Sequence, residues 1–122
     1  MTETEFLQQI SQRWPRTASD AEPTSATLAL VDEAVTSFPA SARLWTMRGD
    51  LLQLGHHGSE HGLREIERCY RRAIEADPRH APAYDELGRF LASMRDNRRK
   101  AKRFLDKARR LRRSAAAAER PL

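Results

Sequence analysis

Two segments of the chain, WTMRGDLL at residues 45–52 and YDELGRFL at residues 84–91, share one pattern and lie 39 residues apart. Two further residue pairs keep the same step: Ala34 with Ala73, and Pro39 with Pro78. Self-similarity at a fixed period of this length is typical of proteins built from stacked pairs of helices. The stretch from residue 45 to residue 88 therefore predicts the architecture of the chain.

Composition fits one small helical domain. The chain has 122 residues, of which 39% are hydrophobic and 32% are charged. Ala, Leu, Arg and Glu outnumber Val and Ile, which favours helix over sheet. No apolar run approaches the roughly 20 residues of a membrane-spanning helix, and the acidic N-terminus lacks the basic and apolar regions of a secretory signal. We therefore expect a cytoplasmic all-α protein without a transmembrane segment.

Helical periodicity and capping residues divide the chain into about six expected helices. These helices cover residues 2–14, 24–37, 41–54, 59–76, 81–94 and a last segment from residue 96. Gly55 is expected to end the third helix in the left-handed conformation, and Asp96 is expected to cap the last one. The predicted organisation is a first helix or cap (1–15), a loop (16–23), helical repeats (24–113) and a helical extension or tail (114–122).

The repeated segments match a known helical repeat. The tetratricopeptide pattern reads Trp-x2-Leu-Gly-x2-Tyr, then Ala-x3-Phe and a closing Pro, in a helix–turn–helix of about 34 residues. Tyr84-x2-Leu87-Gly88-x2-Leu91 fits it, and residues 45–52 fit it with Arg48 in place of Leu. Over residues 24–112 the chain therefore resembles a tetratricopeptide repeat protein. The resemblance implies antiparallel helical pairs stacked as a right-handed superhelix.

The resemblance also assigns packing roles. Large side chains fill the space between the helices, small residues allow close helix approach, and proline ends the second helix of a unit. The predicted packing residues are Trp45, Gly49, Tyr70, Ala73, Pro78, Tyr84 and Gly88. The middle unit departs from the pattern by about four extra residues in its His-rich internal turn, and the first unit lacks the signature.

In similar proteins the first helices of the units line a concave groove that holds a peptide or a partner helix. The matching positions here are Arg43, Thr46, Asp50, Gln53, Asp85 and Arg89, followed by Ala92 and Ser93. The Lys and Asn clamp that some family members use for C-terminal carboxylates is absent from these positions. The resemblance thus implies an adaptor for a protein or peptide partner. A short, half-open solenoid can also complete itself as a homodimer.

The C-terminal part is strongly basic. Residues 1–88 hold nine arginines and fourteen acidic residues, whereas residues 89–113 hold twelve basic and two acidic residues. The predicted basic surface is Arg98, Arg99, Lys102, Arg109 and Arg110. It fits a solvated capping helix or an acidic protein, nucleic-acid phosphates or an anionic membrane surface. Aromatic residues for base stacking do not interleave with these charges, so nucleic acid is the alternative and not the favoured partner.

Residues that suggest metal or catalytic chemistry are few. His56, His57 and His61 are weak metal candidates, because imidazole suits zinc, copper or nickel. They lie in a glycine-flanked turn with no helix-based metal motif, which favours a solvated loop. Cys69 is the only cysteine, and its helical setting predicts a small core residue rather than a reactive thiol. No phosphate-binding glycine loop or nucleophile motif occurs, so we expect neither an enzyme nor a cofactor.

Overall fold

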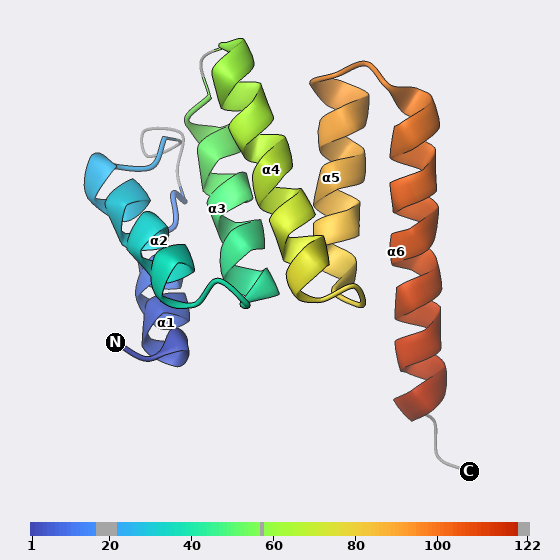
Figure 1. Cartoon of the computed structure of the whole chain (residues 1–122), viewed down its shortest axis with the longest axis horizontal. Coiled ribbons are helices and arrows are strands. Elements are labelled where there is room, and N and C mark those ends of the chain that lie inside the picture. Colours follow the sequence, from blue (N-terminus) through green and yellow to red (C-terminus); the bar gives the residue numbers. More distant parts are fainter. Residues whose placement is uncertain (17–21, 57, 120–122) are drawn as a thin grey trace.

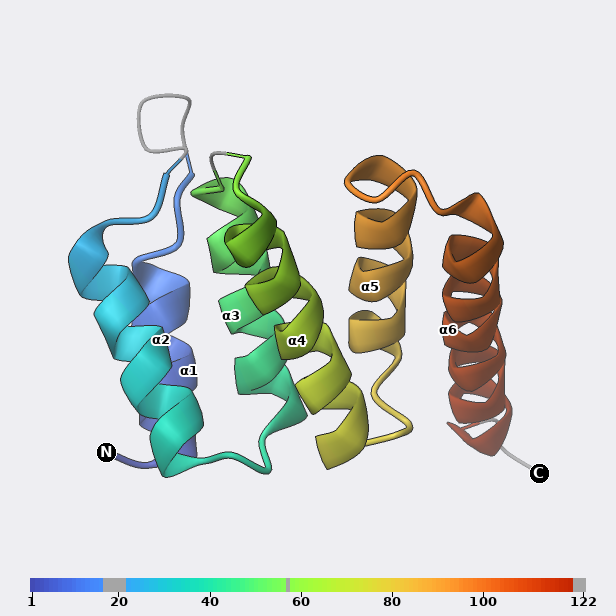
Figure 2. The same cartoon turned by 45° about the horizontal axis from the view of Figure 1, so that its top comes forward.

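The computed structural model describes residues 1–16, 22–56 and 58–119, and these parts contain six α-helices and no strand (Figure 1). They are α1 (Glu3–Gln12), α2 (Ser25–Ser37), α3 (Ala42–Leu54), α4 (Glu60–Ala76), α5 (Ala81–Ser93) and α6 (Arg98–Glu119). Each helix runs antiparallel to the preceding one, and the pairs α1–α2, α3–α4 and α5–α6 follow one another in a row (Figures 1 and 2). The predicted all-α fold of about six helices is confirmed.

Hydroxyl side chains begin the first four helices. Thr2, Thr24, Ser41 and Ser59 each accept a hydrogen bond from the backbone N–H three residues later, at 3.0–3.3 Å. Thr2 and Glu5 also form a reciprocal capping box. These caps satisfy N–H groups that have no partner inside the helix. These helices begin one residue after the predicted starts at residues 2, 24, 41 and 59.

Gly55 ends α3 as predicted, but its predicted conformation and the predicted cap of α6 are wrong. Gly55 has a φ of −98°, because the chain leaves α3 in a further tight turn, and the left-handed glycine is Gly58 (φ 94°). Asp96 does not cap α6. It adopts a φ of 48° that turns the chain, while the side chain of Asn97 accepts the N–H of Lys100 at 3.2 Å. The first helix also ends at Gln12, two residues before its predicted end.

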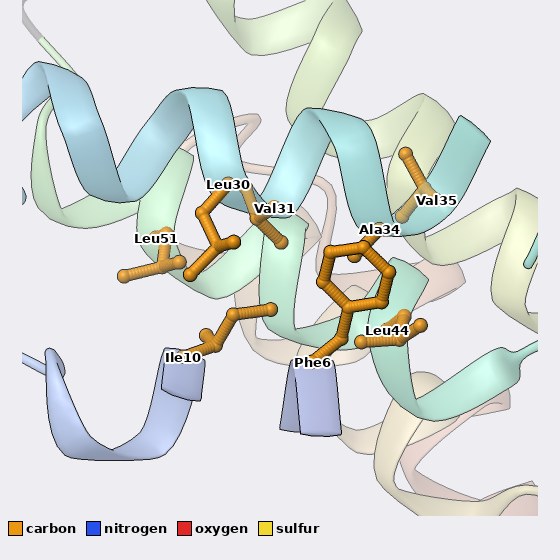
Figure 3. Packing of buried hydrophobic residues seen from close by; sticks show 8 residues of the cluster. All are labelled: Phe6, Ile10, Leu30, Val31, Ala34, Val35, Leu44 and Leu51. Carbon is orange, nitrogen blue, oxygen red and sulfur yellow. The ribbon is translucent and has the colours of Figure 1, made fainter. Parts of the chain in front are cut away.

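A first core fixes the position of α1, whose docking could not be predicted from the sequence. Phe6 and Ile10 point from α1 into a cluster built by α2 and α3 (Figure 3). The other members of this cluster are Leu30, Val31, Ala34, Val35, Leu44 and Leu51. Phe6 and Ile10 are at most 1% exposed, so α1 packs as an integral helix of the first pair.

The 39-residue repeat reappears in the geometry of the two following pairs. The Trp45 indole N–H donates to the carbonyl of Pro39, and the Tyr84 hydroxyl donates to the carbonyl of Pro78, both at 2.8 Å. Each aromatic residue thus ties the start of a pair to the proline that ends the previous one. A second core of six buried residues joins α4, α5 and α6: Ile66, Tyr70, Leu87, Phe90, Leu91 and Ala101.

Candidate functional site

The predicted groove corresponds to the face shared by α3 and α5, and two of its predicted residues are used inside the fold. Thr46 is buried, and its hydroxyl donates to the Ala42 carbonyl at 2.8 Å. The Asp85 side chain is only 14% exposed and forms an ion pair with Arg112 of α6. Arg43 and Arg89 are exposed, as predicted for a binding face. Thr46 and Asp85 are therefore not open to a partner.

Asp50 and Gln53 meet at the hydroxyl group of Tyr70. This hydroxyl donates to Asp50 Oδ1 and accepts from Gln53 Nε2, each at 2.6 Å. The Tyr70 side chain reaches α3 from α4 and is fully buried. Gly49 makes room for it, because a Cβ atom at Gly49 would lie 2.6 Å from Tyr70 Cε1. Residues that build the repeat thus also position a groove carboxylate.

Asp50 is paired with a second carboxylate that was not among the predicted groove residues. Burial, with a smaller contribution from the neighbouring Glu86 carboxyl, raises the pKa of Asp50 to about 7, although the Tyr70 hydrogen bond and Arg89 oppose the shift. Glu86 lies three residues before Arg89 and forms an ion pair with it at 3.6 Å. That spacing places the side chains of Glu86 and Arg89 on one face of α5. It is the sequence signal that could have indicated Glu86, instead of Asp85, as a residue of the binding face.

Replacement of Asp50 by asparagine is expected to change the pH dependence of stability. The pKa of Asp50 is higher in the folded protein than its ordinary value of 3.8, so its stabilising contribution is present below about pH 4 and is lost as the pH rises through about 7. The introduced amide still accepts a hydrogen bond from Tyr70 and cannot ionise. Relative to the wild type, the variant should gain about 4 kcal/mol of unfolding free energy between pH 4 and pH 8. Urea unfolding at both pH values measures the difference, and parallel pH profiles would rule out a raised Asp50 pKa.

Arg48, which replaces the Leu of the repeat pattern, joins three helices. Its guanidinium donates to Asp32 Oδ1 of α2 at 2.7 Å, and to Glu65 Oε2 and Cys69 Sγ of α4 at 3.3 and 2.9 Å. Cys69 is fully buried, and burial raises the pKa of its thiol to about 11 although Arg48 opposes the shift. The thiol is therefore neutral and a poor nucleophile near pH 7, in keeping with the predicted core role.

The His-rich turn shows no metal geometry in the part that is described. His56 Nε2 accepts the backbone N–H of Gly58 at 3.1 Å, and His61 is exposed. His57 lies outside the described residues. Among the described residues, no three His, Cys, Asp or Glu side chains are grouped closely enough to hold a metal ion.

The predicted basic surface lies on α6, where Arg98, Arg99, Lys102, Arg109 and Arg110 are all exposed. Two of these cations share one carboxylate: Lys102 and Arg109 pair with Asp106 at 3.0 and 2.5 Å. Together they hold the pKa of the Asp106 carboxyl below its usual value, chiefly through the hydrogen bond from Lys102. Part of the positive charge of α6 is thus neutralised within the helix.

A second surface, which we call the α4–α6 groove, was not predicted. It is a hollow of about 880 Å³ lined mainly by α4, with Leu91 of α5, the segment between α5 and α6, and Lys100 of the first turn of α6 on its other side. Six cations line it: Arg64, Arg68, Arg71, Arg72, Arg95 and Lys100. Three carboxylates also line it: Glu60, Glu67 and Glu75. The spacing of the four α4 arginines, at positions i, i+4, i+7 and i+8, was the available signal for one basic helix face.

No protein-family model matches the chain, and no curated protein matches its sequence. Within the stretches that the structure describes, none of the helices combines the length and the apolar character needed to cross a membrane. The chemistry of the α3–α5 face and of the α4–α6 groove is therefore the basis for proposing a function.

Proposed function

We propose that this protein is a small adaptor made of tetratricopeptide-like helical pairs, and that it binds a segment of another protein on the α3–α5 face. The observation that carries the proposal is the Asp50 carboxyl, which accepts the Tyr70 hydroxyl at 2.6 Å and whose pKa is raised by burial and by the nearby Glu86. A buried carboxylate beside a second one destabilises the folded state when it ionises. Such perturbed groups cluster at functional sites, and a partner that supplies a cation would relieve the cost.

The chemistry of the partner follows from the charges on this face. A Lys or Arg side chain placed between Asp50 and Glu86 would form charge-assisted hydrogen bonds, which are roughly twice as strong as neutral ones. Arg43 is an exposed cation of the same face, and it favours an acidic residue elsewhere in the bound segment. The proposed ligand is thus a polar segment with one central basic residue. Binding, rather than catalysis, is the proposed activity.

Nucleic-acid binding by α6 is the second candidate function, favoured by the nine cations that this helix exposes. The sharing of Asp106 by Lys102 and Arg109 weakens this candidate. A variant with glutamine at Arg98, Arg99, Lys102 and Arg109 separates the two functions. The adaptor proposal expects unchanged capture of the protein partner, whereas the alternative expects loss of RNA or DNA binding.

Affinity capture from a nuclease-treated extract of the native host, read by mass spectrometry, tests the adaptor proposal. We expect the Asp50→Asn/Glu86→Gln variant to retain its partner at least about tenfold less than the wild type, because a close charge pair contributes about 1.5 kcal/mol or more. Glu33→Gln/Asp96→Asn is the matched control, since it removes two exposed carboxylates elsewhere. Equal capture by all three proteins would refute the assignment of this face.

A further inference from the structure

The α4–α6 groove lies on the side of the molecule formed by α4 and α6, the second helices of their pairs, and its lining is rich in basic side chains. Arg64, Arg68, Arg71 and Arg72 of α4 are all exposed and line the groove. Arg95, after the end of α5, and Lys100 of α6 complete the set. Six cations and three carboxylates leave the groove with net positive charge. An anionic ligand would therefore be attracted to it.

Two of these guanidinium groups are held in place before any ligand arrives. Arg71 lies over the ring of Phe104 at 5.7 Å and pairs with Glu67 at 2.9 Å. Arg72 lies over the Trp45 ring at 5.8 Å. Contacts of this kind restrict the rotamers of long side chains, and a side chain that is already ordered costs less entropy to bind. The groove thus offers preorganised donors for carboxylates.

We infer that the α4–α6 groove binds an acidic segment of a partner protein. Charge complementarity carries this choice of ligand. Glu60, Glu67 and Glu75 line the same groove, and Glu60 pairs with Arg95 and Glu67 with Arg71. The groove therefore alternates carboxylates with cations, which a uniformly charged phosphate backbone does not match. A polypeptide can place its acidic residues opposite the arginines and leave neutral or basic residues opposite these three.

This inference goes beyond the proposed function, since it concerns another surface and a ligand of opposite charge. The α3–α5 face takes a basic residue on Asp50 and Glu86, whereas the α4–α6 groove takes acidic residues on α4 and α6. Two segments of one partner, or two partners, could therefore bind together. Variants of one surface leave the other unchanged, so the failure of either proposal can be recognised separately.

Fluorescence anisotropy with a labelled 18-residue peptide of repeated Asp-Glu-Leu tests the inference. We expect the Arg64→Glu/Arg68→Glu/Lys100→Glu variant to bind at least about tenfold more weakly than the wild type. The matched control, Arg103→Glu/Arg110→Glu/Arg113→Glu, makes the same charge change on exposed positions of α6 outside the groove. It should stay within about threefold of the wild type. The milder pair Arg64→Gln/Lys100→Gln should give an intermediate loss if the triple variant fails to fold.

Several outcomes would overturn the inference. Equal weakening by the groove variant and the control would show attraction to net charge alone. Failure of the wild-type protein to bind the acidic peptide would refute an acidic segment as the ligand of the groove. Tighter groove-dependent binding of single-stranded poly(dT), or of phosphatidylserine vesicles, would assign the groove to nucleic acid or membrane. A peptide of repeated Lys-Lys-Leu should not bind in the groove, and its binding there would also contradict the inference.

Discussion

Replacement of Tyr70 by alanine is expected to lower the free energy of unfolding by about 4 kcal/mol. Tyr70 is fully buried where α3, α4 and α5 meet, and its ring packs beside Phe90 with centroids 6.5 Å apart. Its removal leaves a cavity and takes the hydrogen-bond partner from Asp50 and Gln53. For a domain with a typical stability of about 5–15 kcal/mol, this loss is a large fraction of the total. Urea unfolding followed by circular dichroism measures it.

Phenylalanine at position 70 separates the two contributions of Tyr70. It keeps the ring and removes only the hydroxyl, so we expect a loss of about 1–2 kcal/mol, the usual cost of a buried hydrogen bond left unmade. An alanine variant no less stable than the phenylalanine variant would show that the ring does not hold the helical pairs together.

Alanine at Gly49 is expected to destabilise the protein by about 2 kcal/mol, although alanine favours helix by roughly 1 kcal/mol over glycine. The added Cβ would lie 2.6 Å from Tyr70 Cε1 and 2.8 Å from Cζ. The ring cannot move aside easily, because two hydrogen bonds hold its hydroxyl. Thermal or urea unfolding gives the measurement.

Gly55→Ala is the matched control for Gly49. Its Cβ would meet Pro23 at 3.5 Å, an ordinary contact, and its φ of −98° suits any residue. We expect a change within about 0.5 kcal/mol. A Gly49 variant as stable as this control would contradict the close packing of α3 on Tyr70.

Most of the helical architecture could be predicted because its signals are local. Proline and hydroxyl caps mark the helix ends, and the 39-residue step appears again in the matched hydrogen bonds of Trp45 and Tyr84. The docking of α1 was not predictable, because it depends on long-range contacts of Phe6 and Ile10 with α2 and α3. Asp96 was misassigned since its left-handed backbone leaves the capping role to Asn97.

The candidate site was predicted less completely, for a geometric reason. Neighbouring positions on a helix point about 100° apart, so the choice of Asp85 over Glu86 selected the side chain that pairs with α6. The tetratricopeptide resemblance also predicted Thr46 as a groove residue, but its hydroxyl donates to the Ala42 carbonyl of its own helix. The pairing of Asp50 with Glu86 depends on how closely α3 and α5 pack, which a single sequence does not state.

The α4–α6 groove was missed because charge was counted along the chain. By position, Arg64 to Arg72 belong to the acidic first part and Lys100 belongs to the basic last part. Folding brings the start of α6 beside α4, where Lys100 lines the same hollow as the α4 arginines. The α4–α6 groove could therefore be recognised only from the three-dimensional packing of the helical pairs.

Site-specific photo-crosslinking in the native host tests the central claim most directly, namely that the α3–α5 face is where a partner protein binds. A benzoylphenylalanine at the exposed position of Arg43 or Arg89 places the reactive group on this face, and one at Arg113 of α6 serves as the control. We expect a discrete protein adduct from positions 43 and 89 that position 113 does not give, and that disappears with Asp50→Asn/Glu86→Gln. Adducts formed only from position 113, or equally from all three positions, would contradict the claim.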